Sequence, residues 1–599
     1  MPADKTDGDP LARSPVALDL GEATTVFLLV FLTLHVLVAY VLDAGGWPID
    51  ARWTSLLALG GLALLVALWR RMGWLRPRFD AVATLTWLAL VVGLAAFIIW
   101  LAWPTLLPLT ESSDTTHHAS FTEFIMARRT LAHDQQLDAY LGEMVVYPAG
   151  AHILAALIGT TLGLPGLRSL HPLLALVVSL KAGLVYFIIL RLLPPQRRFP
   201  GLALAGALFL FVARDAFLGS FTRWYFFPMV VSETFAIGAL WALTAWDTGV
   251  SGPHRAALAP LTVYALCGIA VSLIWPTWLP IVALSLVVLV LIRPAMTIAE
   301  RMLAAAVALG PVVLVEFLYL AGHHNDVGVL GNEGSVLKPS VELYGVPLLA
   351  LALLGMVVSA RKRRTLALWS FTIANLAVLG ALWFLALRGR VAFYFGYKMF
   401  YLFLYAVVLF AAMGLDAISG WLQSLSPERL AQRWSLISFL LSLLVLGLIV
   451  PRGIPARDGS VVEEHLYAAG LWAKANLPNG CVDYLVNSQL ASYWLHVQVL
   501  GNPRGSPRTE AIVAAFGQER QADERWQSPP GLPYAIVEDI NQVPDAFRSQ
   551  MRVLYTSGPA AVVQRDGVCR DTTTPIDRLT LVSRGETLAR RLNLGTAQP

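Results

Sequence analysis

A polar stretch between residues 105 and 169 carries the side chains best suited to chemistry. It follows a long apolar segment and includes S-S-D-T-T-H-H, in which Asp114 precedes His117 and His118. Transfer of a sugar to a hydroxyl needs a carboxylate that accepts the hydroxyl proton while the sugar–phosphate bond breaks. We predict that Asp114 is this base, because the preceding apolar segment would hold it near a membrane surface. Solvation of a surface loop is the alternative role of this acid.

Three neighbours of Asp114 are predicted to bind substrate, namely Glu111, His117 and His118. The D-x-x-H-H spacing also suits a divalent cation, because carboxylate and imidazole groups ligate such ions together. Paired histidines in an exposed loop are common without a metal, so we assign no metal ligand and no certain cofactor. A divalent cation stays open as the alternative.

A second candidate group is basic and lies in L-R-G-R-V-A-F-Y-F-G-Y-K-M-F, between two apolar segments. Positive charge is disfavoured in short loops on the non-cytoplasmic side of a membrane. We predict that Arg388, Arg390 and Lys398 bind a lipid phosphate, because arginine pairs with phosphate through a fork of N–H groups and lysine as a point charge. Tyr397 is predicted to contact the substrate. An interfacial aromatic belt with incidental bases is the alternative.

Three further charged residues, Arg223, Glu233 and Glu316, lie in or beside apolar segments and are predicted to bind substrate. A charge inside a membrane costs about 2.5–3.5 kcal/mol on insertion scales, so it favours a functional interpretation. The alternative is a structural ion pair in which Arg214 or Arg223 pairs with Asp215 or Glu233. Lys181, in the middle of an apolar segment, receives no role.

The composition indicates that lipid, and not water, surrounds most of the chain. The chain has 599 residues, of which 57% are hydrophobic and 14% charged, and its mean hydropathy is +0.63. Apolar runs of about 17 to 25 residues recur through the first three quarters, each long enough to cross a hydrocarbon core of ~30 Å as a helix. These values exclude an ordinary soluble protein and predict a polytopic α-helical membrane protein that binds no nucleic acid.

The positions of lysine and arginine predict the orientation. Clusters such as 70–71, 197–198 and 361–364 are predicted to be cytoplasmic, and residues 146–163 to form a short helix at the outer interface. About 13 crossings follow, with a cytoplasmic tail at 1–23, a membrane domain at 24–450 and a first large outer loop at 105–169. The predicted spans are 24–43, 53–70, 81–104, 170–193, 200–218, 229–248, 257–275, 277–294, 302–321, 343–360, 366–387, 397–418 and 434–450.

Residues 451–599 are predicted to form an α/β domain outside the cytoplasm. A helix is expected at 463–476 and strands at 482–486, 534–537 and 560–563, each bounded by turn residues. Cys481 and Cys569 both lie in this domain, where an oxidising compartment would permit a disulfide; two unpaired cysteines are the alternative.

The pattern S-S-D-T-T-H-H…F-I-M-A-R-R-T-L…Y-L-G-E-M-V-V-Y-P-A-G resembles the first outer loop of the GT-C superfamily of integral-membrane glycosyltransferases. Within that superfamily it is similar to the galactan arabinofuranosyltransferases, in which an acid precedes a short helix and a Y-P-P-G segment. The resemblance implies a polyprenyl-phosphate-linked sugar donor, an inverting transfer, Asp114 in the acidic position and Lys398 or Arg390 at the donor phosphate. Two departures are Ala149 in place of the second proline and histidines in place of aspartate neighbours.

The resemblance also implies an acceptor that is a glycan, a lipid or a protein, and a site outside the cytoplasm at the bacterial inner (plasma) membrane. Two other classes stay open. A lipid-linked glycan transporter or flippase would also place charges in a membrane cavity, although repeated halves with broken helices are not evident. An O-antigen ligase or polymerase would share the lipid-linked donor but carry its long loop late in the chain.

Overall fold

The computed structural model divides the chain into two compact units, each assembled from three separate stretches. The first unit comprises Met1–Val38, Thr54–Ile98 and Leu174–Pro455, and the second comprises Ala39–Trp53, Ile99–Leu173 and Ala456–Pro599. Within these bounds the structure describes residues 18–75, 78–109, 113–194, 198–249, 254–293, 296–322, 336–425, 460, 462–504, 532–569 and 574–581. Glu111 and the predicted span at 434–450 lie outside the described residues.

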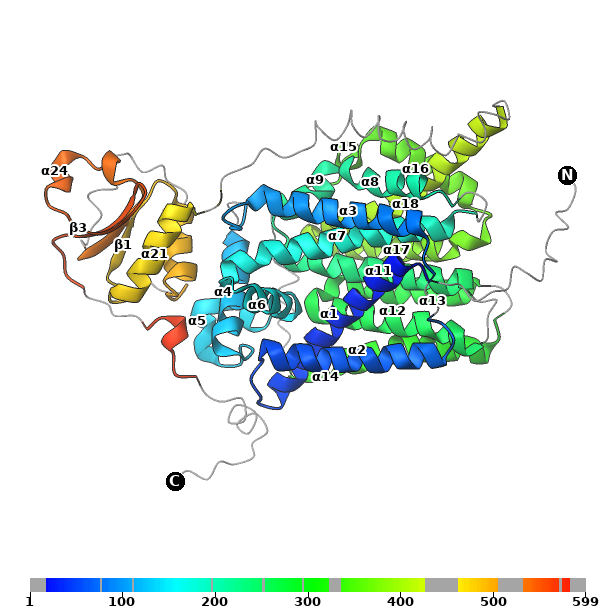
Figure 1. The fold of residues 1–599 in the computed structure, drawn as a ribbon, viewed down its shortest axis with the longest axis horizontal. Helices are drawn as coiled ribbons and strands as arrows, with labels where there is room; N and C mark the ends of the chain where they lie inside the picture. Colours follow the sequence, from blue (N-terminus) through cyan, green and yellow to red (C-terminus); the bar gives the residue numbers. More distant parts are fainter. Residues whose placement is uncertain are drawn as a thin grey trace, which may run out of the picture. The chain divides into compact units, whose positions relative to one another are not determined.

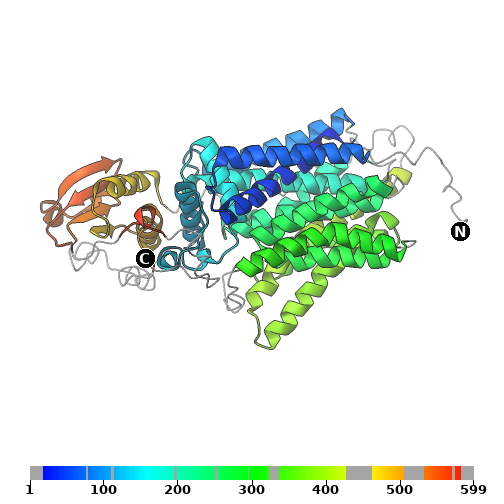
Figure 2. The same cartoon turned by 90° about the horizontal axis from the view of Figure 1, so that it is seen from below.

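The first unit is a bundle of long apolar helices that run side by side (Figures 1 and 2). The described residues hold nine helices long and apolar enough to cross a membrane, or up to eleven if two bent pairs each count as one span. The structure confirms the prediction of a polytopic helical membrane protein, but it does not confirm the predicted number of about 13 spans. The helices from the first unit and its borders are α1 (Leu20–Ala44), α2 (Ala51–Arg71), α3 (Ala81–Ala102), α7 (Gly166–Leu192), α8 (Pro200–Leu208), α9 (Arg214–Phe217), α10 (Gly219–Thr222), α11 (Phe227–Gly249), α12 (His254–Ile274), α13 (Leu279–Ile292), α14 (Ile298–Gly322), α15 (Val341–Tyr344), α16 (Val346–Ser359), α17 (Leu366–Leu387) and α18 (Phe393–Leu425).

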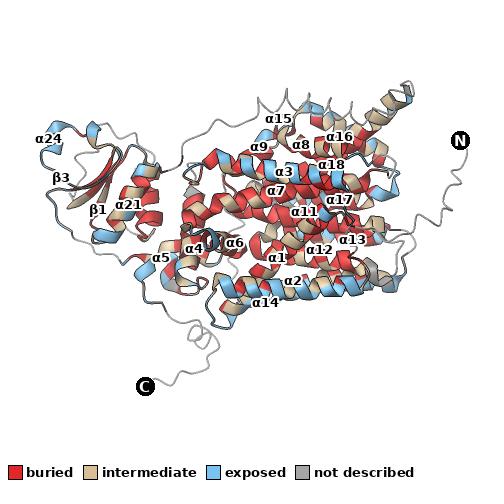
Figure 3. Ribbon diagram, viewed as in Figure 1, coloured by how far each residue is buried: buried red, intermediate tan, exposed pale blue. Residues whose placement is uncertain are grey.

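Burial separates the helices at the centre of this bundle from those at its rim (Figure 3). Every residue of α11 from Phe227 to Trp246 is buried, whereas α2 and α14 expose leucines such as Leu64 and Leu318. Exposed apolar side chains on membrane-length helices are expected where lipid is the solvent. The structure thus describes an integral membrane protein whose core surrounds α11.

The predicted span at 200–218 is wrong as a single helix. The segment Pro200–Phe211 is bent by 77° relative to Arg214–Thr222, so α8 ends before the charged pair Arg214–Asp215. The nine residues of α8 are too short to cross a hydrocarbon core. Both charged side chains are exposed, which explains why the helix does not continue through them.

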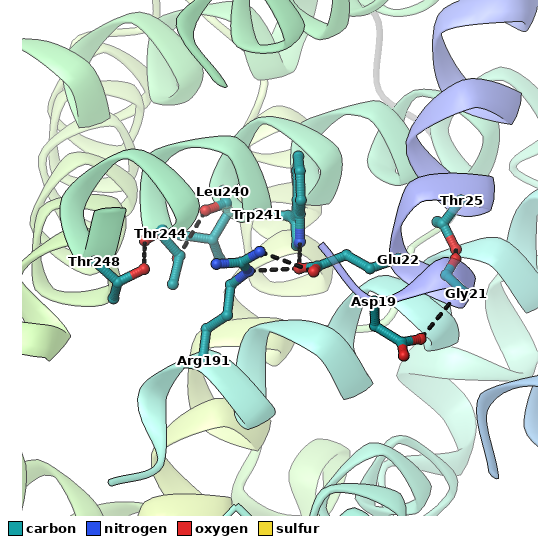
Figure 4. Close-up of polar contacts among 9 residues, drawn as sticks. All are labelled: Asp19, Gly21, Glu22, Thr25, Arg191, Leu240, Trp241, Thr244 and Thr248. Carbon is teal, nitrogen blue, oxygen red and sulfur yellow. Dashed lines mark hydrogen bonds and ion pairs between the residues drawn. The ribbon is translucent and has the colours of Figure 1, made fainter. Parts of the chain in front are cut away.

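A buried cluster joins α1, α7 and α11 at one end of the bundle (Figure 4). Glu22 accepts hydrogen bonds from Arg191, with Nη2–Oε2 at 2.8 Å, and from the indole N–H of Trp241 at 2.7 Å. All three side chains are almost fully buried, so the forked arginine–carboxylate pair satisfies both charges. This cluster fixes the register of the three helices.

More arginines gather around this cluster. Arg198 lies within electrostatic reach of Arg191 and Arg364, and Asp247, at the end of α11, is within reach of Arg293 and Arg363. We call the end of the bundle that holds these five arginines the arginine end. Residues from several loops that were predicted to share the cytoplasmic side therefore share one end of the first unit.

The second unit combines a small sheet with the polar stretch between residues 105 and 169. The sheet has the order β1-β2-β4-β3, with β1 parallel to β2 and both β2 and β3 antiparallel to β4. The disulfide between Cys481 and Cys569 is formed, so the pairing that the sequence left open is resolved. Its principal elements are α4 (Ser113–Arg128), α5 (Asp138–Leu141), α6 (Gly150–Leu162), α21 (Glu464–Asn476), β1 (Val482–Leu485), α22 (Gln489–Tyr493), β2 (Tyr534–Val537), α24 (Asp545–Arg548), β3 (Arg552–Ser557) and β4 (Ala560–Gln564).

The helix predicted at 463–476 and the strands predicted at 482–486, 534–537 and 560–563 are all present, as α21, β1, β2 and β4. Strand β3 was not predicted. It lies at the edge of the sheet, and none of its residues is buried, so it lacks the apolar alternation that marks an inner strand. Helix α6 has 13 residues, about 20 Å, which is short for a span as expected.

Candidate functional site

Lys398 lies near the start of α18 and is the most enclosed of the predicted phosphate-binding residues. Its ammonium group is 4.2 Å from the ring centroid of Tyr394, 4.5 Å from that of Phe226 and 4.6 Å from that of Trp275. The residue is only 3% exposed. Aromatic faces stabilise a cation at such distances. Three segments of the chain therefore hold one positive charge inside an apolar bundle.

A second buried charge cluster contains Glu233, which was predicted to bind substrate. Glu233 Oε2 accepts hydrogen bonds from Lys181 Nζ at 2.6 Å and from the hydroxyl of Tyr405 at 3.0 Å. Lys181 and Glu233 are both almost fully buried. Glu233 thus forms the structural ion pair that was the alternative to substrate binding. Its partner is Lys181, and not Arg214 or Arg223 as that alternative assumed.

The length of α11 separates the Lys398 cluster from the arginine end. Phe226 immediately precedes α11, and Asp247 lies near its end, which corresponds to about 30 Å of helix. This length matches the hydrocarbon thickness of a membrane. Within the first unit, therefore, the Lys398 cluster lies one membrane thickness from the arginine end, and the Lys181–Glu233 pair lies between them.

The other predicted residues of the first unit are more exposed than Lys398. Arg223, Arg388 and Arg390 are exposed, Tyr397 is half-buried against Trp383, and half-buried Glu316 accepts a hydrogen bond from the Ser272 hydroxyl. An exposed arginine keeps its hydration and needs no ligand. Of this set, Lys398 and Glu233 are the residues whose burial calls for a chemical explanation.

In the second unit, Asp114 is the second residue of α4. It precedes His117 and His118 by three and four positions, which is one helical turn. The first turn of a helix favours a negatively charged residue, because the unpaired N–H groups there carry partial positive charge. The backbone of α4 thus places the predicted base in a turn suited to a carboxylate; its side chain lies outside what the structure describes.

His117 connects α4 to two distant parts of the chain. Its Nδ1 is 2.8 Å from Glu143 Oε1, and its Nε2 is 2.9 Å from the hydroxyl of Tyr493. Arg504 donates to the other oxygen of Glu143 at 3.0 Å. The imidazole is therefore held at both nitrogens, which fixes its orientation.

His118 has a different environment. Its Nδ1 lies 3.0 Å from Nε2 of His152 on α6, and its ring contacts Tyr147 with the centroids 5.6 Å apart. His118 and His152 are buried, at 7% and 0% exposed. The two adjacent histidines of α4 thus support separate contacts, and His118 joins α4 to the Y-P-A-G-A-H segment.

The metal alternative for D-x-x-H-H would need carboxylate and imidazole groups that converge on one point. Across the described ranges, no group of three or more His, Cys, Asp or Glu side chains is arranged to hold a metal ion. His117 uses both ring nitrogens in protein contacts.

The fold adds residues that the sequence did not single out. Lys181 and Tyr405 complete the Glu233 cluster, and Glu143 and Tyr493 hold His117. The sequence could have predicted that Lys181 has a partner, because a lysine in the middle of an apolar helix needs one. It could not have predicted the contact of Tyr493, which is 376 residues from His117.

Glu143 should make the folding stability of the second unit depend on pH. Burial opposes its ionisation, but the hydrogen bond and charge of His117 and the charge of Arg504 outweigh burial and lower the pKa of Glu143 from 4.5 to about 2. A lowered native pKa contributes stability that is fully present above 4.5 and is lost as the pH falls from 4.5 towards 2. The melting temperature of wild type should therefore exceed that of Glu143→Gln at pH 7, and the two should converge in this acid range.

The effect is modest, because the Glu143 side chain is 45% exposed and water screens its interactions. Glu342→Gln, which alters an exposed acid on α15, is the matched control and should keep a constant difference from wild type. A Glu143→Gln difference that does not change between pH 6 and pH 3 would contradict this assignment.

No family model and no curated protein matches the sequence. Solved structures do match over most of the chain. ArnT from Cupriavidus metallidurans bound to undecaprenyl phosphate shares 13% identity at a TM-score of 0.46, covering 81% of this chain and 99% of that one. The Archaeoglobus fulgidus oligosaccharyltransferase in its apo form shares 13% identity at a TM-score of 0.48, covering 77% and 69%. Both are GT-C superfamily membrane glycosyltransferases, but matches at this level transfer neither a ligand nor an activity to this chain.

Proposed function

We propose that this chain is a membrane glycosyltransferase that moves a sugar from a polyprenyl-phosphate donor to an acceptor hydroxyl on the non-cytoplasmic side of the bacterial inner membrane. The observation that carries the proposal is the buried Lys398 ammonium among Phe226, Trp275 and Tyr394. A polyprenyl chain partitions into lipid, and its phosphate would need a cation at membrane depth. Lys398 supplies such a charge about 30 Å of helix from the arginine end.

The proposed reaction gives Lys398 and Asp114 separate roles. The acceptor oxygen attacks the anomeric carbon of the donor, forming the new glycosidic bond, while the bond from that carbon to the phosphate oxygen breaks. The electron pair leaves with the phosphate, whose negative charge Lys398 stabilises, and the acceptor proton passes to the Asp114 carboxylate. A single displacement of this kind inverts the anomeric configuration. Transfer of arabinofuranose is the finer proposal that the loop resemblance supports.

The sequence assigns three basic residues, Lys398, Arg388 and Arg390, to the donor phosphate. The burial of Lys398 supports giving it the larger part, because a charge pair strengthens as water is excluded. Arg388 and Arg390 are exposed and would contribute attraction at the surface.

Replacing Lys398 with methionine should weaken donor binding more than turnover. Methionine keeps the volume and apolar contacts but removes the charge, and a hydrogen bond to a charged group contributes about 1.5–3 kcal/mol. The KM for a polyprenyl-phosphate sugar should therefore rise by about 10- to 100-fold. The measurement is a transfer assay in proteoliposomes, with a panel of polyprenyl-phosphate sugars including arabinofuranose, with and without a chelator.

Lys362→Met is the matched control, because Lys362 is an exposed lysine in the loop before α17, next to the arginine end. It should leave the donor KM unchanged. If the donor KM of Lys398→Met equals that of wild type, Lys398 does not bind the donor phosphate. Movement of the intact lipid-linked sugar across the vesicle bilayer, without any product, would instead support a flippase. The anomeric configuration of the product, determined by NMR, tests inversion.

A further inference from the structure

The second unit contains a pocket that the proposed transfer reaction does not use. Its volume is about 80 Å³, room for about three water molecules. It opens between α4, the segment 574–581 and η10 (Trp494–Val499), a π-helical turn. We call it the α4 pocket. The lining residues that matter below are Ser120, Phe124, Arg128, Tyr140, Gln498 and Asn502.

The wall formed by residues 574–581 is fixed in place by side chains of the polar stretch. Arg128 Nη2 donates to the carbonyl oxygens of Ile576 at 3.0 Å and Leu579 at 2.7 Å. The Tyr140 hydroxyl donates to the carbonyl oxygen of Thr574 at 2.6 Å. These three hydrogen bonds make the wall a built part of the unit, so the pocket has a defined shape.

Three lining residues carry buried polar atoms without a hydrogen-bond partner among the described residues: Ser120 Oγ, Arg128 Nε and Gln498 Oε1. Ser120 is 9% exposed and Gln498 is 7% exposed. Leaving such an atom unpaired costs about 1–3 kcal/mol, and native proteins hold few of them. The presence of three such atoms on residues that line one pocket favours a bound polar molecule that completes their hydrogen bonds.

The lining has no excess of either charge. Lys474 Nζ lies 3.7 Å from Asp577 Oδ2, and the lining also holds one further base, Arg128, and one further acid, Glu123. The formal charges of the lining therefore sum to zero, which favours a neutral ligand over an ion. The other lining residues include two hydroxyls, two side-chain amides, the rings of Phe124 and Tyr140 and several aliphatic side chains, which together offer hydrogen bonds and an apolar ring face.

We propose that the α4 pocket holds one edge of a neutral sugar ring of the acceptor glycan, with Ser120 and Gln498 hydrogen-bonding its hydroxyls. A sugar ring presents hydroxyls at its edge and apolar C–H groups on its face, which matches the amide, hydroxyl and aromatic lining. The π-helical turn supports this role, because such turns are frequent at functional sites and η10 carries Gln498 to the pocket. This inference rests on the proposed function and narrows its acceptor to a glycan.

Gln498→Met separates the ligand role from a structural one. Methionine has a similar size and removes the unpaired oxygen, so without ligand its melting temperature should equal or exceed that of wild type. Its affinity for sugar should fall by about tenfold, the loss of roughly one to two hydrogen bonds. The probes are methyl glycosides of arabinose, galactose, glucose and mannose, added to the full-length protein in detergent. Binding is measured by saturation-transfer NMR and by the shift in melting temperature.

Ser120→Ala should weaken binding in the same direction, and Gln550→Met, at an exposed glutamine outside the pocket, should leave it unchanged. Three outcomes would overturn the inference: no glycoside binds wild type, Gln498→Met binds as well as wild type, or inorganic phosphate competes and thereby reveals an anion site.

The same titration on Asp114→Asn distinguishes the two proposals. Bound sugar in an inactive Asp114→Asn protein supports the pocket independently of the catalytic base. If wild type transfers sugar but binds no glycoside, the sugar-binding role of the pocket is contradicted and the proposed function is not. If wild type binds glycosides but transfers no sugar, the proposed function is contradicted and the sugar-binding role is not.

Discussion

Asp114→Asn is expected to lower sugar transfer by about 10²- to 10⁴-fold, the usual contribution of a positioned proton acceptor. Asparagine keeps the size of the side chain and its ability to accept hydrogen bonds in the first turn of α4, but its amide cannot take up the acceptor proton. The melting temperature and membrane insertion should therefore be unchanged. The measurement is the turnover of a polyprenyl-phosphate sugar under saturating donor, so that a loss reports the chemical step and not donor binding.

Asp138→Asn is the matched control, since Asp138 is an exposed acid at the start of α5 in the same polar stretch. It should retain full turnover. If Asp114→Asn also keeps wild-type turnover, the base must be sought elsewhere, with the remaining acids of residues 105–169 as the next candidates.

Breaking the Lys181–Glu233 pair should strongly destabilise the bundle. Either Lys181→Met or Glu233→Gln leaves the partner charge buried among apolar helices, at a cost of about 3–5 kcal/mol. The double variant removes both charges, and the Tyr405 hydroxyl can still donate to the side-chain amide oxygen that Glu233→Gln introduces. It should therefore recover most of the lost stability.

The measurement is unfolding of the purified protein in mixed micelles as the fraction of a denaturing detergent is increased. The control pair is Lys362→Met with Glu342→Gln, two exposed residues whose effects should be small and additive. A double variant as unstable as the sum of its two single changes would show that the buried charges do not stabilise each other.

The long helices could be predicted because their cause is local. A run of twenty apolar residues satisfies its own backbone in lipid whatever its neighbours are, and α1, α3, α7, α11 and α17 follow this rule. The break between α8 and α9 depends on where Arg214 and Asp215 find water, and this is set by the packed bundle. Strand β3 likewise owes its place to pairing with β4 and not to its own residues.

The residues of the candidate sites likewise fall into those that the sequence could predict and those that depend on packing. Lys398 could be singled out because a lysine beside an outer loop conflicts with the expected charge distribution. Its aromatic neighbours Phe226 and Trp275 could not, since they lie more than a hundred residues earlier in the chain. Lys181 receives no role from the sequence, because its partner on α11 is visible only when two helices pack. The contacts of His117 with Glu143 and Tyr493 were missed for the same reason.

The second unit is assembled from three separate stretches of the chain, and this determines when during synthesis it can fold. A ribosome delivers α4 early and residues 456–599 last, so Tyr493 and Arg504 reach His117 and Glu143 only after the helical bundle has been synthesised. Until then the loop with the predicted base lacks the side chains that orient it. The contacts within residues 105–169 are therefore completed only after the membrane helices of the first unit have been synthesised.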